Sequence, residues 1–174
     1  MKFENIKSVI DSLVTALSVD YPDVIIQLAD QDFDKPEYPY GTYKILVLNQ
    51  DPPHSASSWI EATSAEDFKQ VFRKNQTASI SLAFLHNSSI STCWDLCQMA
   101  VDWFDSIQGM TECEKFGITP QLITGDVQDR TTVLESTQYE YKAGFDVMFR
   151  SRKFNETQGK TTASAPSVEF QEEA

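Results

Sequence analysis

The stretch QYEYKAGFDVMFRSRKF, residues 138–154, alternates between two kinds of side chain along most of its length. One set of alternate positions is apolar or aromatic: Tyr139, Tyr141, Ala143, Phe145, Val147 and Phe149. The intervening positions are mostly polar or charged: Glu140, Lys142, Asp146, Met148 and Arg150. Because successive side chains of a strand point to opposite faces, this period of two predicts a long β-strand with one wet face.

Further stretches predict five shorter strands in the same sheet. Four of them are apolar or β-branched and are bounded by turn-forming residues: 24–29, 42–50, 121–127 and a short segment around SWIEAT. Residues 68–85 fit a helical turn at their start, but a strand explains the whole stretch better. In that strand one face carries Phe68, Phe72, Ala78, Ile80, Leu82 and Phe84.

Two segments show the 3.6-residue period of amphipathic helices. In residues 3–19 the apolar face is Ile6, Val9, Ile10, Leu13, Val14 and Leu17. In residues 88–109, capped by Ser88 or Ser89 and ended by Gly109, the expected buried stripe is Ile90, Trp94, Cys97, Val101 and Phe104. A short helix, a turn at Gly117 and a connection through TTVLES are expected between this helix and the long strand.

These elements predict an α+β fold, with a mixed, mainly antiparallel sheet and two main helices packed on one face. Residues 1–154 would form this single domain. Residues 155–174 are polar and offer little apolar area, so their burial cannot offset the entropy of ordering them. We therefore expect a flexible C-terminal segment.

The composition excludes several classes of protein. The net charge is −12 and the 14 basic residues are scattered, with RSRK (150–153) as the only local cluster, which disfavours a nucleic-acid binder. No apolar run is long enough to span a membrane. Three cysteines without a secretory signal argue against a disulfide framework and favour a cytosolic product.

The candidate chemical sites have simpler explanations. Asp30, Asp32 and Asp34 have the opening spacing of a calcium loop, but Lys35 and Gly41 stand where such a loop needs glycine and glutamate. Cys93 and Cys97 lack a second pair for zinc and fit core thiols. No catalytic motif surrounds either histidine, His54 or His86. We expect no metal, no cofactor and no enzyme activity, with a small metal-binding or enzymatic α+β domain as the alternative.

Several segments, in order along most of the chain, resemble phage neck and tail terminator proteins. EYPYGTYKILVL has the Pro-Tyr pair that leads into a strand through a Thr-Tyr step. QTASISLAF followed by a helix resembles the family's central strand and helix, although FLHN stands where the family often has glycine. The closest match is DVQDRTTVLESTQYEYKAGFDVMFRSR, and SAPSVEF resembles a short terminal motif.

The resemblance implies a virion structural protein of the tail or neck that carries no catalytic residues. Six copies would form a closed ring that caps the tail tube and joins it to the head connector, with DNA passing through the lumen. The implied partners are other copies of the chain, the tail tube protein, a head-completion or connector protein and, as a further candidate, the tail sheath protein. The alternative within virions is a head-completion or connector adaptor.

Two surfaces follow as hypotheses from this expectation. Asp95, Asp102 and Asp105 form a polar stripe on the second helix and would line an acidic lumen that repels DNA and lets it slide. Subunit or partner contacts would involve two segments of the chain. The expected contact residues are Pro39, Tyr40, Tyr43, Pro166, Val168 and Phe170.

Overall fold

The computed structural model describes residues 1–31, 34–50, 56–63, 67–122, 127–135 and 138–160. Within them the chain forms three helices and eight strands, and the predicted α+β class is confirmed. The elements are α1 (Phe3–Leu17), β1 (Ile25–Leu28), β2 (Tyr40–Gln50), β3 (Ala56–Ala62), β4 (Asp67–His86), α2 (Ile90–Asp105), α3 (Ile107–Lys115), β5 (Ile118–Leu122), β6 (Gln128–Asp129), β7 (Thr132–Glu135) and β8 (Gln138–Lys160).

Two long antiparallel strands, β4 and β8, form the centre of the sheet. They pair continuously from Asp67 opposite Lys160 to His86 opposite Tyr141. β2 and β3 pair with the other side of β4, whereas β5, β6 and β7 pair with the other side of β8. β1 lies parallel to β2, which makes the sheet mixed. The predicted strands in 68–85 and 138–154 are therefore confirmed and form the longest pair.

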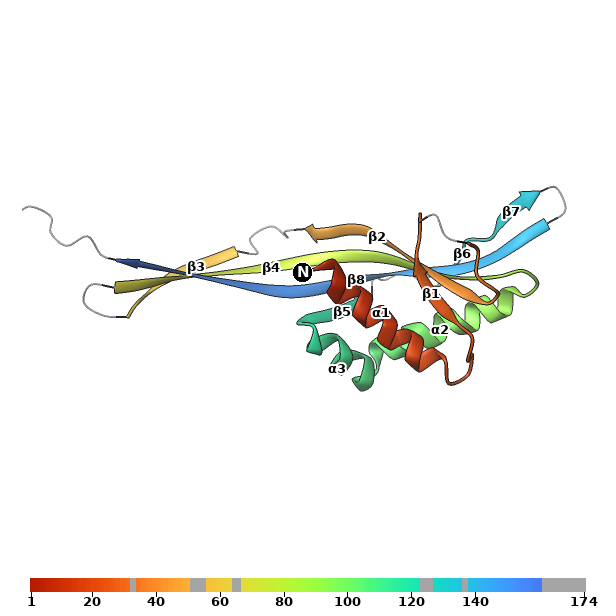
Figure 1. Ribbon diagram of the computed structural model, residues 1–174, viewed down its shortest axis with the longest axis horizontal. Coiled ribbons are helices and arrows are strands. Elements are labelled where there is room, and N and C mark those ends of the chain that lie inside the picture. Colours follow the sequence, from red (N-terminus) through yellow and green to blue (C-terminus); the bar gives the residue numbers. More distant parts are fainter. Residues whose placement is uncertain (32–33, 51–55, 64–66, 123–126, 136–137, 161–174) are drawn as a thin grey trace, which may run out of the picture.

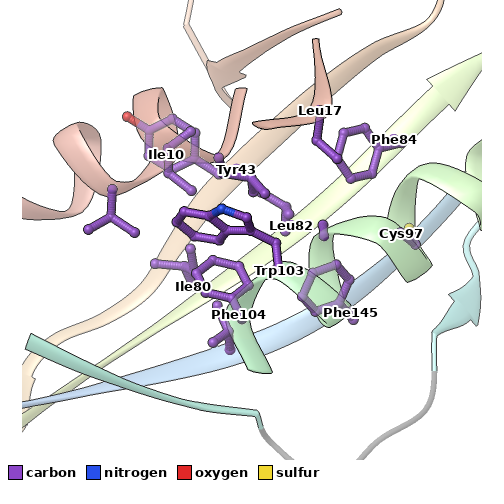
Figure 2. Packing of buried hydrophobic residues seen from close by; sticks show 14 of the residues in the cluster. Ile10, Leu17, Tyr43, Ile80, Leu82, Phe84, Cys97, Trp103, Phe104 and Phe145 are labelled. Carbon is purple, nitrogen blue, oxygen red and sulfur yellow. The ribbon is translucent and has the colours of Figure 1, made fainter. Parts of the chain in front are cut away.

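All three helices lie against one face of the middle of this sheet (Figure 1). The strand positions that face them alternate as predicted, and the buried ones are Ala78, Ile80, Leu82 and Phe84 in β4 and Ala143, Phe145, Val147 and Phe149 in β8. Figure 2 shows how the helices contribute Ile10, Leu17, Trp103 and Phe104 to the same cluster. Each large apolar side chain buried there stabilises the fold by about 1.5–3 kcal/mol.

The predicted buried stripe of the second helix is partly wrong. Cys97 and Phe104 are buried, but Trp94 is 39% exposed and the remaining contacts come from Cys93, Leu96, Ala100 and Trp103. Apolar residues occupy more than half of this helix surface, so periodicity alone allows two overlapping stripes. Contact with the sheet selects the one whose Phe104 ring packs edge-on against Phe145 and Phe149.

The second helix also ends earlier than predicted. Ser106, and not Gly109, separates α2 from α3, because its backbone is extended and its hydroxyl accepts a hydrogen bond from the Gly109 amide at 3.0 Å. Gly109 is buried inside α3, where a Cβ atom would collide with the Trp103 carbonyl oxygen. The predicted N-terminal cap is confirmed, with Ser89 accepting from the Thr92 amide.

Two further boundaries differ from the sequence expectation. TTVLES is not only a connection, since β7 lies within it and pairs with the start of β8. β8 continues to Lys160, so residues 155–160, expected at the start of the flexible segment, are strand. The expectation for residues 161–174 falls outside the described residues. The physical reason for the longer strand is its partner, because β4 extends equally far and offers a complete ladder.

Beyond the helices, three strands continue as a projecting sheet, the β-arm, composed of residues 56–62, 67–76 and 152–160 (Figure 1). No helix covers it on either face in the described structure. At about 3.3 Å per residue, residues 67–76 span about 30 Å. The rest of the described chain, with the helices and the core, is called the body below.

Candidate interaction surfaces

The structure places the cysteines in the core. Cys93, Cys97 and Cys113 are free and buried, as predicted for core thiols. Burial raises the pKa of the Cys93 thiol to about 11 and that of Cys97 and Cys113 to about 12, so all three are protonated at neutral pH and pack as small apolar groups. Among the described residues, no group of His, Cys, Asp and Glu is arranged to hold a metal ion.

The described helices do not have the features of a membrane span. In the part of the chain that the structure describes, no helix is both long and apolar enough to cross a bilayer. Their exposed sides are instead rich in charge. This is clearest on α2, which contains three acidic residues and no basic one.

The predicted acidic stripe on α2 is exposed. Asp95, Asp102 and Asp105 all lie on the side of the helix that faces away from the sheet. The Gln98 side-chain amide donates a hydrogen bond to the Asp102 carboxylate at 2.8 Å. The stripe is thus an accessible anionic surface, as its expected role next to DNA requires.

The acidic connection between β1 and β2 is fixed to the sheet at both ends. Near its start, the Asp30 carboxylate forms a salt bridge with Lys44 at 2.5 Å. Further along, the Glu140 carboxylate of β8 receives the Lys35 ammonium at 2.5 Å and the Tyr38 hydroxyl at 2.7 Å. Burial opposes ionisation of Glu140, but the hydrogen bonds from Lys35 and Tyr38 outweigh it and lower its pKa.

The predicted contact residues in this region lie mainly inside the subunit. Tyr40 and Tyr43 are 6% and 3% exposed, so they pack against their own chain, while Pro39 is half-buried. A neighbour that binds here would therefore meet Pro39 and the half-buried Tyr38 first. The other predicted contact residues, Pro166, Val168 and Phe170, lie outside the described residues.

A basic surface on the β-arm was not predicted from the sequence. Pairing of β4 with β8 brings RSRK next to the FRK of residues 72–74, placing Arg152 opposite Asn75 and Phe154 opposite Arg73. By strand alternation Arg73, Arg150 and Arg152 share the sheet face that points away from the helices. Within the described residues, none of these three arginines has a carboxylate partner. Both short basic runs were visible in the sequence, but their adjacency depends on a pairing across more than 70 residues.

The β-arm also exposes large apolar side chains. Trp59, Ile60 and Phe154 are 40%, 67% and 56% exposed. Val71, in the middle strand of the arm, is buried, which gives the arm one small packed centre. Large apolar groups on an uncovered sheet are typical of surfaces that meet a partner.

The charge of the β-arm is opposite to that of the rest of the chain. Residues 56–62, 67–76 and 152–160 contain six basic and three acidic residues, a net charge of +3. The body contains 16 acidic and eight basic residues, a net charge of −8. The arm and the body are therefore electrostatically complementary to each other.

Comparison with known families agrees with this picture of a protein built from contact surfaces. The model of the phage neck terminator protein family matches residues 4–172, which include both the body and the β-arm. A search of curated proteins gave no match. Because the family model covers nearly the whole chain, this protein belongs to the phage neck terminator family and is a structural component of the phage neck.

Proposed function

We propose that this protein is the tail terminator of its phage. Six copies form a closed ring that caps the tail tube and presents the head connector with a different surface. The observation that carries the proposal is the family match over residues 4–172, because it includes the projecting arm as well as the core. Assembly would take place in the host cytoplasm, and the protein would remain in the neck of the virion.

The physical task of a terminator is to stop growth. Head-to-tail contacts between rings of a tail tube do not close on themselves, so the tube could lengthen without limit. A ring that binds the last tube ring on one face and lacks a tube-like surface on the other ends the series. The partners are thus the tube protein on one side, a head-completion or connector protein on the other, and a sheath protein if the tail is contractile.

The dimensions and charge of the chain are compatible with a DNA channel. Without the arm, a compact body of roughly 120 residues has a diameter of roughly 35 Å, and six such bodies in contact leave a hole of roughly the same size. A duplex about 20 Å across would pass through it. The exposed Asp95, Asp102 and Asp105 on α2 are our candidates for the lumen wall, where they would repel the DNA backbone.

Phage particles that lack this protein test the proposal. Electron microscopy should show overlong tails or tails without heads. Normal free tails of uniform length would instead indicate a head-completion adaptor. A ring reconstruction whose lumen carries more Lys and Arg than Asp and Glu would contradict the acidic channel while leaving the terminator role intact.

A further inference from the structure

We infer that the basic face of the β-arm docks on the acidic body of a neighbouring copy of this chain. The inference deepens the proposed function, because it rests on several copies assembling side by side. It concerns the sheet face of the arm that points away from the helices. This face presents Arg73, Arg152 and Phe154 in the arm, and Arg150 at the base of the arm, where β8 enters the body.

The charges of the three arginines are close together and unpaired in the described structure. Arg150 and Arg152 are two residues apart on one strand face, and Arg73 is the diagonal neighbour of Arg152 on β4. Such neighbours lie within about 8 Å of each other, so their charges repel. Glu156 is the other diagonal neighbour of Arg73, but it pairs with Lys69, and none of the three arginines forms an ion pair in the described structure. Guanidinium groups bind carboxylates through paired hydrogen bonds, which makes an anionic partner the natural complement.

In the described structure, no helix packs on either face of the β-arm (Figure 1). A three-stranded sheet with both faces open buries too little apolar area to be firmly stable alone. The outer edge of β3 and the outer edge of residues 152–160 have no strand partner among the described residues. Open edges and exposed apolar groups favour association with another chain. Trp59 and Phe154, which share the sheet face of Arg73, supply the apolar part of such a contact.

The surface that complements the basic face is the acidic helix layer of another copy. The helix layer, residues 3–24 and 90–115, contains nine acidic residues and two basic ones. Nearly all of these acids are exposed, including Asp11, Asp20, Asp23 and Glu114. The complementary anionic surface is thus present on every other copy of the chain. An arm about 30 Å long extends far enough from its own body to reach a neighbour.

A nucleic acid fits this face less well. Surfaces that bind a phosphate backbone are basic throughout, because each contact replaces a counterion. Here the arm also carries Glu61, Asp67 and Glu156, and the Glu156 carboxylate already pairs with Lys69 at 2.6 Å. Mixed charge around the exposed Trp59 and Phe154 is typical of a protein contact.

Sedimentation velocity of the purified full chain at low and high salt tests the inference. The wild type should self-associate, and more weakly as salt rises. The double variant Arg150→Glu with Arg152→Glu should weaken self-association about tenfold or more, because attraction becomes repulsion. The control, Lys2→Glu with Lys7→Glu, makes the same change in net charge at exposed positions of the acidic helix layer and just before it, and should associate at least as strongly as the wild type.

Unfolding midpoints of both double variants should match the wild type, which separates a lost contact from a lost fold. Combining the arm variant with Asp20→Lys and Asp23→Lys, or with Asp102→Lys and Asp105→Lys, should restore association for whichever pair lies at the contact. Restoration by either pair supports the inference. Failure of both pairs, or an arm variant that associates like the wild type, overturns it.

Two further outcomes separate this inference from the proposed function. A wild-type chain that remains monomeric in all these conditions overturns arm docking, whereas a ring in the neck of the virion would still support the terminator. Fluorescence anisotropy with a labelled 20-base-pair duplex tests the other class of partner. If the wild type binds the duplex and the arm variant does not, the partner of the basic face is DNA and not a neighbouring copy, which would overturn the inference.

Discussion

The body and the β-arm are built from the same two strands, yet they differ in almost every physical property. In the body, alternate residues of β8 such as Phe145 and Phe149 are fully covered by helices. A few residues further along the same strand, Phe154 is 56% exposed and its neighbours are charged. The ladder of hydrogen bonds is continuous through both regions. What distinguishes the two regions is that helices pack on the sheet in the body and, in the described structure, not in the arm (Figure 1).

The largest difference should appear when the same residue type is removed from each region. Phe149→Ala leaves a cavity among helices and should lower the free energy of unfolding by about 3–5 kcal/mol. Phe154→Ala removes an exposed ring and should change it by less than about 1 kcal/mol. Denaturant unfolding of both variants measures this. Equal losses would mean that the arm is covered within the subunit, and the distinction drawn here would fail.

A smaller contrast is expected between two glycines of β8. A Cβ atom at Gly144 would lie 2.6 Å from the Leu82 carbonyl oxygen, so Gly144→Ala should cost about 1–3 kcal/mol through displaced backbone. At Gly159 the added atom would meet the ring of Phe68, a side chain of the arm that has room to turn. Gly159→Ala should therefore be close to neutral. Thermal unfolding compares the two, and a Gly159 variant as unstable as the Gly144 variant would show a rigid arm.

The next comparison uses one ion pair from each region. Glu140→Gln weakens the contacts with Lys35 and Tyr38 and should cost about 1 kcal/mol at pH 7, because Glu140 is largely enclosed while Lys35 is half exposed. Since folding lowers the pKa of Glu140, its contribution is complete above the usual value of 4.5 and is lost as pH falls through the lower folded-state pKa.

The matched variant in the arm is Glu156→Gln, which breaks the pair with Lys69 on an open sheet face. It should change stability little at any pH, because solvent screens exposed pairs. Unfolding curves at pH 7 and pH 3 for both variants provide the measurement. A Glu140 variant that keeps its full deficit at pH 3 would show that the loss is not electrostatic.

The smallest effect on stability is expected from removal of residues 161–174, which leaves the whole of β8 in place. The free energy of unfolding of the truncated chain should match that of the full chain. Assembly should nevertheless weaken if Pro166, Val168 and Phe170 add to a sheet edge of a neighbour, as extended peptides do. The assay is tail capping by phage lacking the native protein and supplied with the truncated chain, and unchanged capping would contradict this role.

Part of the fold was accessible from local pattern. The alternation of residues 139–149 predicted β8, and the period of residues 6–17 predicted the buried face of α1, because each pattern reflects the geometry of its own element. The buried face of α2 was not predictable in full. Trp94 and Trp103 are equally apolar, and only contact with the sheet leaves the first exposed and buries the second.

The candidate surfaces divide in the same way. The acidic stripe of Asp95, Asp102 and Asp105 could be drawn on a helix from sequence alone, and it is exposed as drawn. The basic face could not, because Arg73 and Arg152 become neighbours only through the register of β4 with β8. The sequence by itself determined most of the strands and helices and that the chain is strongly acidic. Tertiary structure decided where the positive charge collects and which strand positions remain uncovered, since both depend on contacts between residues far apart in the chain.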